Sequence, residues 1–98
     1  MFINSDDPHC KAVIEAFENC KQNVMDNGLL YTLCQRLNEL ENQHHYEPLN
    51  IHITLASVYA KKAIAYKNPE KRAETINEIY EPIYRLPIVL NKMEKKKP

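Results

Sequence analysis

Apolar side chains recur at steps of three and four residues along this sequence, in segments of which three begin at X-Pro steps. This spacing places the apolar residues on one face of an α-helix. The steps are Asp7-Pro8, Glu47-Pro48 and Asn68-Pro69. Proline suits the first helical position, where no N–H is needed, and Asp7 and Asn68 can also cap a helix with their side-chain oxygens. The sequence therefore predicts an all-α protein.

The pattern divides the chain into four helices. They are expected at residues 8–26, from just after Gly28 to about residue 43, at 48–67, and from 69 onward. Asn27-Gly28 is expected to end the first helix in a left-handed turn. The third segment opens with a strand-like alternation, so a short strand is an alternative there, but its alanines favour a small-residue face on a central helix. The predicted class is an antiparallel four-helix bundle.

Two prolines interrupt the apolar C-terminal segment IYEPIYRLPIVL at residues 79–90. Pro82 removes a helical hydrogen bond and clashes with the carbonyl of Glu78, which costs about 3 kcal/mol or more in a straight helix. The last helix is therefore expected to be kinked or broken at Pro82, with a short helix or turn starting near Pro87. Such a segment can expose an apolar patch that binds a protein partner. The predicted partner-binding residues are Tyr80, Tyr84, Arg85, Leu86, Ile88 and Leu90.

Length and composition limit the class of protein. Ninety-eight residues, 44% hydrophobic and with one glycine, suit a single helical domain, assigned to 1–94, with a solvated basic tail at 95–98. The three cysteines match no zinc or redox spacing and are expected in the core as free thiols. The chain shows neither a secretory signal nor an apolar run of about 20 residues. We therefore expect a cytoplasmic protein.

The charges are unevenly spread although the formal net charge is zero. Residues 1–49 carry eight acidic and three basic side chains, and residues 50–98 carry five acidic and ten basic ones. This asymmetry suggests internal complementarity, ordinary solvated faces, or a surface for an anionic partner. The predicted basic corner consists of Lys61, Lys62, Lys67, Lys71 and Arg72. It could contact phosphates, lipid headgroups or an acidic protein, although no helix-turn-helix pattern supports a DNA-binding role.

The sequence contains no recognisable catalytic or metal-binding motif. His44, His45 and His52, with Glu47 nearby, lack the converging spacing of a zinc site. The sequence contains no glycine-rich phosphate loop and no GxSxG or HExxH motif. We therefore expect no enzyme activity, no catalytic residue, no metal and no cofactor, and we do not expect a small-molecule substrate.

One family shares this layout of helices. The segments AVIEAFENCKQ, LLYTLCQRLNELENQ and EPLNIHITLASVYAKKAIAYK follow one another over residues 12–80, and PLNIHITLASVYAKKA gives the best local similarity. The chain resembles the immunity proteins that protect producers of pediocin-like (class IIa) bacteriocins. The resemblance implies a cytosolic antiparallel four-helix bundle. It also implies that the C-terminal half recognises a bacteriocin acting with a membrane mannose permease, at the cytosolic face of the membrane.

A weaker resemblance is to the tetratricopeptide hairpin. Leu55, Ala56 and Tyr59, with Ala73 and Pro87 downstream, follow roughly its order, but the distances exceed its 34-residue period. That resemblance implies a peptide-binding helical module. The sequence therefore predicts an immunity or inhibitor protein that binds a protein partner through its C-terminal half. The alternatives are a nucleic-acid-binding or regulatory protein that uses the basic corner, and a tetratricopeptide-like module.

Overall fold

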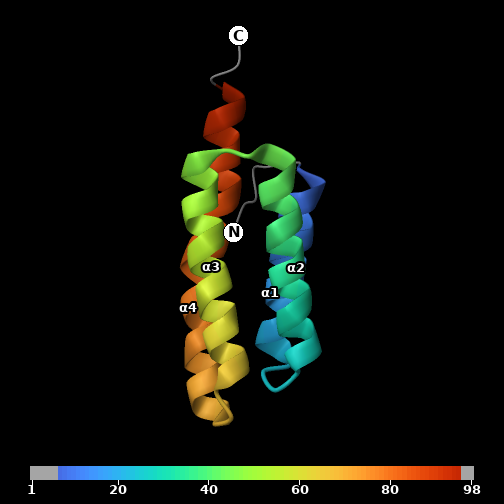
Figure 1. Ribbon diagram of the computed structural model, residues 1–98, viewed down its shortest axis with the longest axis vertical. Helices are drawn as coiled ribbons and strands as arrows, with labels where there is room; N and C mark the ends of the chain where they lie inside the picture. Colours follow the sequence, from blue (N-terminus) through green and yellow to red (C-terminus); the bar gives the residue numbers. More distant parts are fainter. Residues whose placement is uncertain (1–6, 96–98) are drawn as a thin grey trace.

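The computed structural model describes residues 7–95. Four helices follow one another, α1 (Pro8–Gln22), α2 (Asn27–His44), α3 (Glu47–Ala65) and α4 (Pro69–Lys95). They run alternately up and down (Figure 1), which confirms the predicted all-α, antiparallel four-helix bundle. Each helix packs against its neighbours in sequence, and α1 also packs against α4, so the bundle closes. Tetratricopeptide repeats instead stack helix pairs in an open solenoid, so that alternative loses its structural basis.

The predicted caps start the first and the last helix. The Asp7 carboxylate accepts hydrogen bonds from the N–H groups of His9 and Cys10, at 2.8 and 3.0 Å. The Asn68 side chain accepts from the first two N–H groups that follow Pro69, at 2.9 and 3.2 Å. α3 has no side-chain cap. Local sequence signals therefore determine where α1 and α4 begin.

The boundary between α1 and α2 differs from the prediction. α1 ends at Gln22, and Gly28 already belongs to the first turn of α2, without a positive φ. The Asp26 carboxylate caps α2 by accepting from the N–H of Leu29 at 3.2 Å. A Cβ on Gly28 would lie 3.1 Å from that carboxylate oxygen, so the glycine leaves room for the cap. The left-handed residue is instead His45, which ends α2 with φ 47° and ψ 43°.

The prediction allowed either a kink or a break at Pro82. The break does not occur, and the separate short helix or turn expected near Pro87 is wrong, because α4 continues through both prolines to Lys95. Because proline has no N–H, the carbonyls of Glu78 and Ile83, four residues before Pro82 and Pro87, lose their helical donors. Both proline rings are buried in the bundle. Packing along the length of α4 therefore outweighs the lost hydrogen bonds. Of the predicted tail, Lys95 is the last residue of α4, and 96–98 lie outside the described residues.

The hydrophobic core lies between the four helices and is formed by the apolar face that the residue spacing predicts for each helix. It contains Cys10, Val13, Ile14, Phe17 and Cys20 of α1, Leu30, Leu33, Leu37 and Leu40 of α2, Leu49, Ile53, Ala56, Ala60 and Ala63 of α3, and Ile76, Ile79, Ile83, Leu86 and Leu90 of α4. The alanines of α3 form the predicted small-residue face. α3 is not central, however, because every helix has two neighbours in the closed bundle.

The bundle is long and narrow, with extents of 49 × 25 × 17 Å. At a rise of about 1.5 Å per residue, α4 is about 40 Å long and α1 about 22 Å. The C-terminal end of α4 consequently projects beyond the other helices (Figure 1). Among the described residues, no helix combines the length and the apolar character needed to cross a membrane.

Candidate functional site

Three of the six predicted partner-binding residues form a row on the outer side of α4. Tyr80, Tyr84 and Ile88 are four residues apart, so they lie above one another on the same side of the helix. Tyr80 and Ile88 are each 46% exposed, and Tyr84 between them is partly buried. We call these three residues the tyrosine–isoleucine stripe.

The other predicted partner-binding residues lie elsewhere. Leu86 and Leu90 are fully buried, so their assignment to an exposed patch is wrong. Because α4 does not end at Pro82, both leucines continue the core face that contains Ile83. Arg85 is exposed and pairs with Glu81 at 3.1 Å, one turn earlier in the helix.

Aromatic packing against α1 holds the tyrosine–isoleucine stripe in place. The buried ring of Phe17 meets the ring of Tyr84 edge-on, with centroids 6.2 Å apart. The rings of Tyr80 and Tyr84 lie 4.6 Å apart at 32°. The ammonium group of Lys21 lies over the rings of Phe17 and Tyr80, at 5.6 and 5.9 Å from their centroids. The two tyrosines are therefore anchored at one side and open to solvent at the other.

A hydrogen bond between helices fixes Tyr84 further. Its hydroxyl donates to the Glu18 carboxylate at 2.6 Å. Burial raises the pKa of Tyr84 to about 12, and the bond to Glu18 acts in the same direction. The phenol therefore remains a neutral donor at physiological pH, and α1 and α4 present this surface as one unit.

A groove lies between α4 and α3, and Tyr80 of the tyrosine–isoleucine stripe forms part of its wall. Its volume is about 680 Å³. It is lined by His52, Leu55 and Tyr59 of α3 and by Asn77, Glu78, Tyr80, Glu81, Pro82 and Arg85 of α4. Both apolar and charged side chains line the groove, a combination that is typical of sites that bind another molecule non-covalently.

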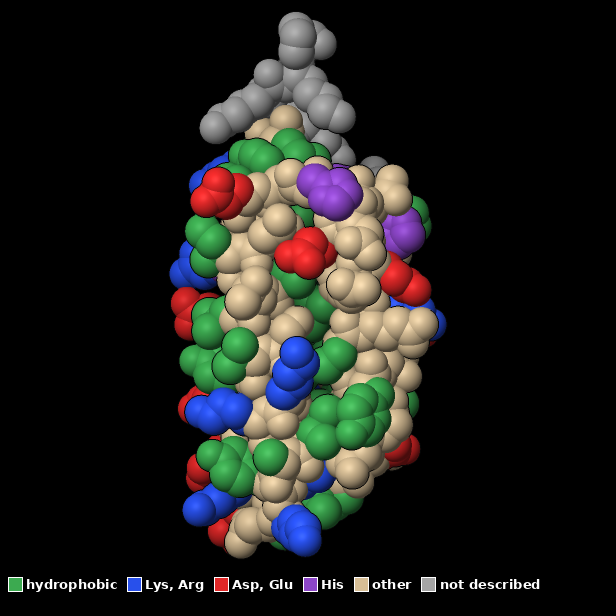
Figure 2. Space-filling model, in the orientation of Figure 1, with side chains coloured by type: hydrophobic (Ala, Val, Ile, Leu, Met, Phe, Trp, Pro, Cys, Tyr) green, Lys and Arg blue, Asp and Glu red, His purple; other side chains and the backbone are tan. Residues whose placement is uncertain are grey.

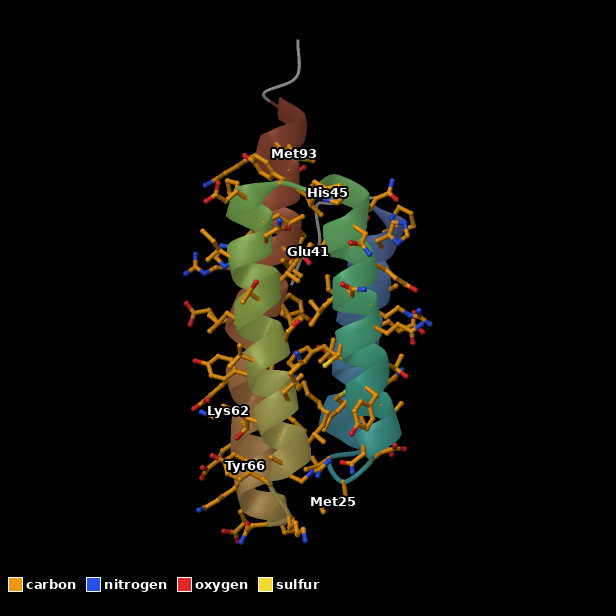
Figure 3. All side chains as sticks on the ribbon, in the orientation of Figure 1. Met25, Glu41, His45, Lys62, Tyr66 and Met93 are labelled. Atoms are coloured by element: carbon orange, nitrogen blue, oxygen red, sulfur yellow. The ribbon has the colours of Figure 1, made fainter. Side chains whose placement is uncertain are left out.

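Four members of the predicted basic corner are exposed, namely Lys61, Lys62, Lys67 and Lys71. The ammonium group of Lys62 lies 5.8 Å from the ring centroid of Tyr59, and that of Lys71 lies 5.9 Å from that of Tyr66. Figure 3 shows Lys62 and Tyr66 toward one end of the bundle, on the side away from α2. Lys62 and Lys71 therefore pack partly on tyrosine rings, which restricts the reach of these two lysines toward phosphates.

Arg72 does not belong to the anionic-contact surface, contrary to the prediction, because only 3% of it is exposed. Its guanidinium donates to the carbonyls of Val24 and Tyr66, both at 3.0 Å, and to Oδ1 of Asn27 at 2.5 Å. These groups satisfy the arginine inside the protein. The basic corner therefore loses one of its five cations, which weakens the nucleic-acid alternative.

The histidines are separated in the structure. Nε2 of His44 lies 2.6 Å from Oδ2 of Asp7, so this pair connects the end of α2 with the start of α1. His52 instead lines the groove between α3 and α4. Within residues 7–95, no group of three or more His, Cys, Asp or Glu side chains is placed to hold a metal ion.

The three cysteines are free, as predicted, but only two are fully in the core. Burial raises the pKa of Cys10 to about 12 and that of Cys20 to about 11, so both remain thiols. Cys34 is partly exposed and lines a smaller depression between α2 and α3 that also contains Lys61. Burial raises its pKa as well, against the opposing effect of Lys61.

The sequence interpretation missed an apolar row on the outer face of α3. Ile51, Leu55 and Val58 are 61%, 41% and 48% exposed. Their spacing of four and three residues, opposite the core face of Leu49 and Ile53, was the available signal. We call these three residues the α3 outer stripe.

Comparison of this chain with models of known protein families, with curated protein sequences and with solved structures found no match.

Proposed function

We propose that this protein is a small non-covalent protein-binding module of the immunity or inhibitor type, which recognises its partner through its C-terminal half. The observation that carries the proposal is the tyrosine–isoleucine stripe of α4. It combines two aromatic residues with an exposed isoleucine on a rigid helix face. Tyrosine is enriched among the residues that dominate binding energy at protein interfaces.

The surroundings of the stripe also favour a protein partner. Lys21 and Glu18 flank the tyrosines with charges of opposite sign, which gives the apolar stripe a polar rim. The aromatic contacts with Phe17 order both rings before binding, so little side-chain entropy is lost on association.

The resemblance to the immunity proteins of pediocin-like bacteriocins supports a narrower form of the proposal. In this form the partner is a bacteriocin together with the membrane permease that it targets, reached from the cytosolic face. The closed antiparallel bundle agrees with the fold that the resemblance implies.

A protection assay tests this role. Expression of the chain in a sensitive bacterium is expected to protect it from one member of a panel of pediocin-like bacteriocins. Ile88→Asp is expected to reduce that protection about tenfold or more, because it places a charge at the apolar anchor. The readout is the bacteriocin concentration that halves growth.

The matched control is Gln35→Asp, which adds the same charge at an exposed position of α2. Both variants are expected to retain the helical circular dichroism of the unmodified protein. Absence of protection against every bacteriocin of the panel would overturn the immunity role. Equal protection by the Ile88 and Gln35 variants would remove the stripe as the recognition surface.

A further inference from the structure

Arg72 is a buried cation without a carboxylate partner. It is 3% exposed, and its hydrogen bonds go to two backbone carbonyls and to Oδ1 of Asn27. Within residues 7–95, no Asp or Glu side chain forms an ion pair with it. A buried charge is costly unless it is paired. A negative charge in place of the Asn27 amide would therefore supply the counter-ion that Arg72 lacks.

The residue after Asn27 is Gly28, the one glycine of the sequence. In an Asn-Gly pair the backbone nitrogen of the glycine can attack the side-chain carbonyl carbon of the asparagine, because no Cβ shields that nitrogen. The attack closes a five-membered succinimide ring and releases ammonia. Asn-Gly is for this reason the pair of residues most prone to deamidation.

The start of α2 leaves the reacting groups available. Gly28 lies in the first turn of the helix, where backbone N–H groups have no helical acceptor, and the Asp26 cap accepts from Leu29 instead. The attacking nitrogen therefore gives up no helical hydrogen bond. Asn27 is exposed, so water can reach it and ammonia can leave. Figure 1 places the α1–α2 loop at one end of the bundle, and Figure 2 shows that end open to solvent, with basic side chains at its surface.

Arg72 activates the amide of Asn27 for this reaction. Its Nη2 lies 2.5 Å from Oδ1, the oxygen on which negative charge develops when the carbonyl carbon is attacked. A positioned cation stabilises such charge in the transition state. The side-chain NH2 group, which has to leave, donates no hydrogen bond to any residue in the range 7–95. The amide is therefore held by its oxygen, while its nitrogen has no partner within that range.

We propose that Asn27 is a self-modification site, which deamidates through a succinimide with Gly28 and becomes the counter-ion of Arg72. The Gly28 nitrogen loses its proton to a solvent base and bonds to Cγ of Asn27. The Cγ–Nδ2 bond breaks, and the amide nitrogen takes up a proton and leaves as ammonia. Water then adds to Cγ, the ring opens, Gly28 regains its N–H, and a carboxylate remains. The net change exchanges water for ammonia and needs neither an oxidant nor a reductant.

The surroundings of position 27 favour the carboxylate. α2 has no acidic side chain in its first turn, where a negative charge is stabilised by the helix dipole. Asp26 opposes the new charge, but its side chain is exposed and is screened by solvent. This inference goes beyond the proposed function, because neither Asn27 nor Arg72 belongs to the tyrosine–isoleucine stripe.

Mass spectrometry of the purified full chain tests the reaction. The chain is incubated at mildly alkaline pH, and fragmentation of the tryptic peptide that contains both Asn23 and Asn27 locates the modified residue. Asn23 is the internal control, because it is exposed in the same loop but precedes the β-branched Val24. Asn27 is expected to deamidate at least about tenfold faster than Asn23. Equal rates at the two positions would overturn the proposal.

The identity of the product tests the role of Arg72. In an unfolded chain the succinimide opens mainly at the backbone carbonyl, which gives isoaspartate. In the folded protein Arg72 polarises the side-chain carbonyl, so water is expected to attack there and give mainly aspartate. Chromatography against synthetic peptides separates the two products, and the chain incubated in urea is the comparison. A predominance of isoaspartate in both samples would overturn this role.

Asn27→Asp tests the counter-ion directly, since it carries the product of the proposed reaction. It is expected to melt about 4 °C or more above the unmodified chain near neutral pH, because a charge pair replaces a bond to a neutral amide. The gain is expected to be lost in acid, where the carboxylate takes up a proton. Asn23→Asp is the control and is expected to give no gain, because it adds the charge at the C-terminal end of α1.

A double-variant cycle separates the pair from the helix dipole. In the background of Arg72→Met, Asn27→Asp is expected to lose most of its effect on melting. Circular dichroism checks that every variant keeps its helices. A gain that persists in that background or in acid, or no gain in the unmodified background, would overturn the counter-ion. None of these results depends on the protection assay, so failure here and failure of the immunity role are separate observations.

Discussion

At the scale of single residues, Arg72 has the most consequential position. A buried cation usually pairs with a carboxylate, but the guanidinium of Arg72 bonds to two carbonyls and one amide oxygen. Val24 lies just beyond the end of α1, and Tyr66 caps the end of α3. Helix C-termini carry unpaired carbonyls and a partial negative charge, which favour a cation there. Arg72 therefore joins the ends of two helices to the start of α4.

Arg72→Met is expected to lower the free energy of unfolding by roughly 2–4 kcal/mol, because three partly buried hydrogen bonds are lost while the volume is nearly kept. Lys71→Met is the control and is expected to change stability by less than about 0.5 kcal/mol, since Lys71 is exposed. Urea unfolding measures both values. Similar stabilities for the two variants would show that Arg72 contributes little.

At the scale of elements, α4 shows how packing can override a local signal. Pro82 and Pro87 each remove one helical hydrogen bond, yet the helix spans 27 residues. The apolar residues on its inner side, including Ile83 and Leu86, are buried against the rest of the bundle. Their burial contributes about 1.5–3 kcal/mol per large side chain. This contribution offsets the cost of the prolines.

Replacing Pro82 by alanine is expected to raise the free energy of unfolding by about 1–2 kcal/mol. The change restores the hydrogen bond to the Glu78 carbonyl, and part of this gain is offset by the greater freedom of the unfolded chain. Pro69→Ala is the control and is expected to be nearly neutral, because proline costs nothing at the first helical position. If thermal unfolding shows no difference between the two variants, the proline does not strain α4.

At the scale of the whole molecule, Asp7 connects the two ends of the first helical hairpin. Burial by itself raises the pKa of Asp7, but the N–H groups of Cys10 and His9 and the side chain of His44 outweigh it and hold the pKa below its ordinary value of 3.8. A carboxylate with a lowered pKa stabilises the folded state at pH values above its unfolded pKa. That stabilisation is lost as the pH falls through the lower pKa of the folded state.

Asp7→Asn is therefore expected to destabilise the protein near neutral pH, with a difference that disappears in acid. Asparagine still caps a helix, so the variant removes mainly the charge that faces His44. Urea unfolding from about pH 7 down to about pH 2.5 measures the difference. A difference that stays constant over this range would mean that the ionised form of Asp7 is not what stabilises the fold.

Local sequence signals were sufficient to predict the helical class, the number of helices and the starts of α1 and α4. Those features depend on interactions between residues a few positions apart, such as the Asp7 and Asn68 caps and the spacing of apolar residues. Of the six residues that the sequence predicted as partner-binding, Tyr80, Arg85 and Ile88 are exposed and Tyr84 is partly buried.

Four features became evident only from the packing of the helices. α4 passes through Pro82, Arg72 is buried, Leu86 and Leu90 belong to the core, and the α3 outer stripe is exposed. Each of these outcomes depends on which distant segment covers a side chain. Arg72, for example, meets Val24 and Asn27 across 48 and 45 positions. Local periodicity shows which residues share a helix face, but only the packing of the helices determines which face is covered.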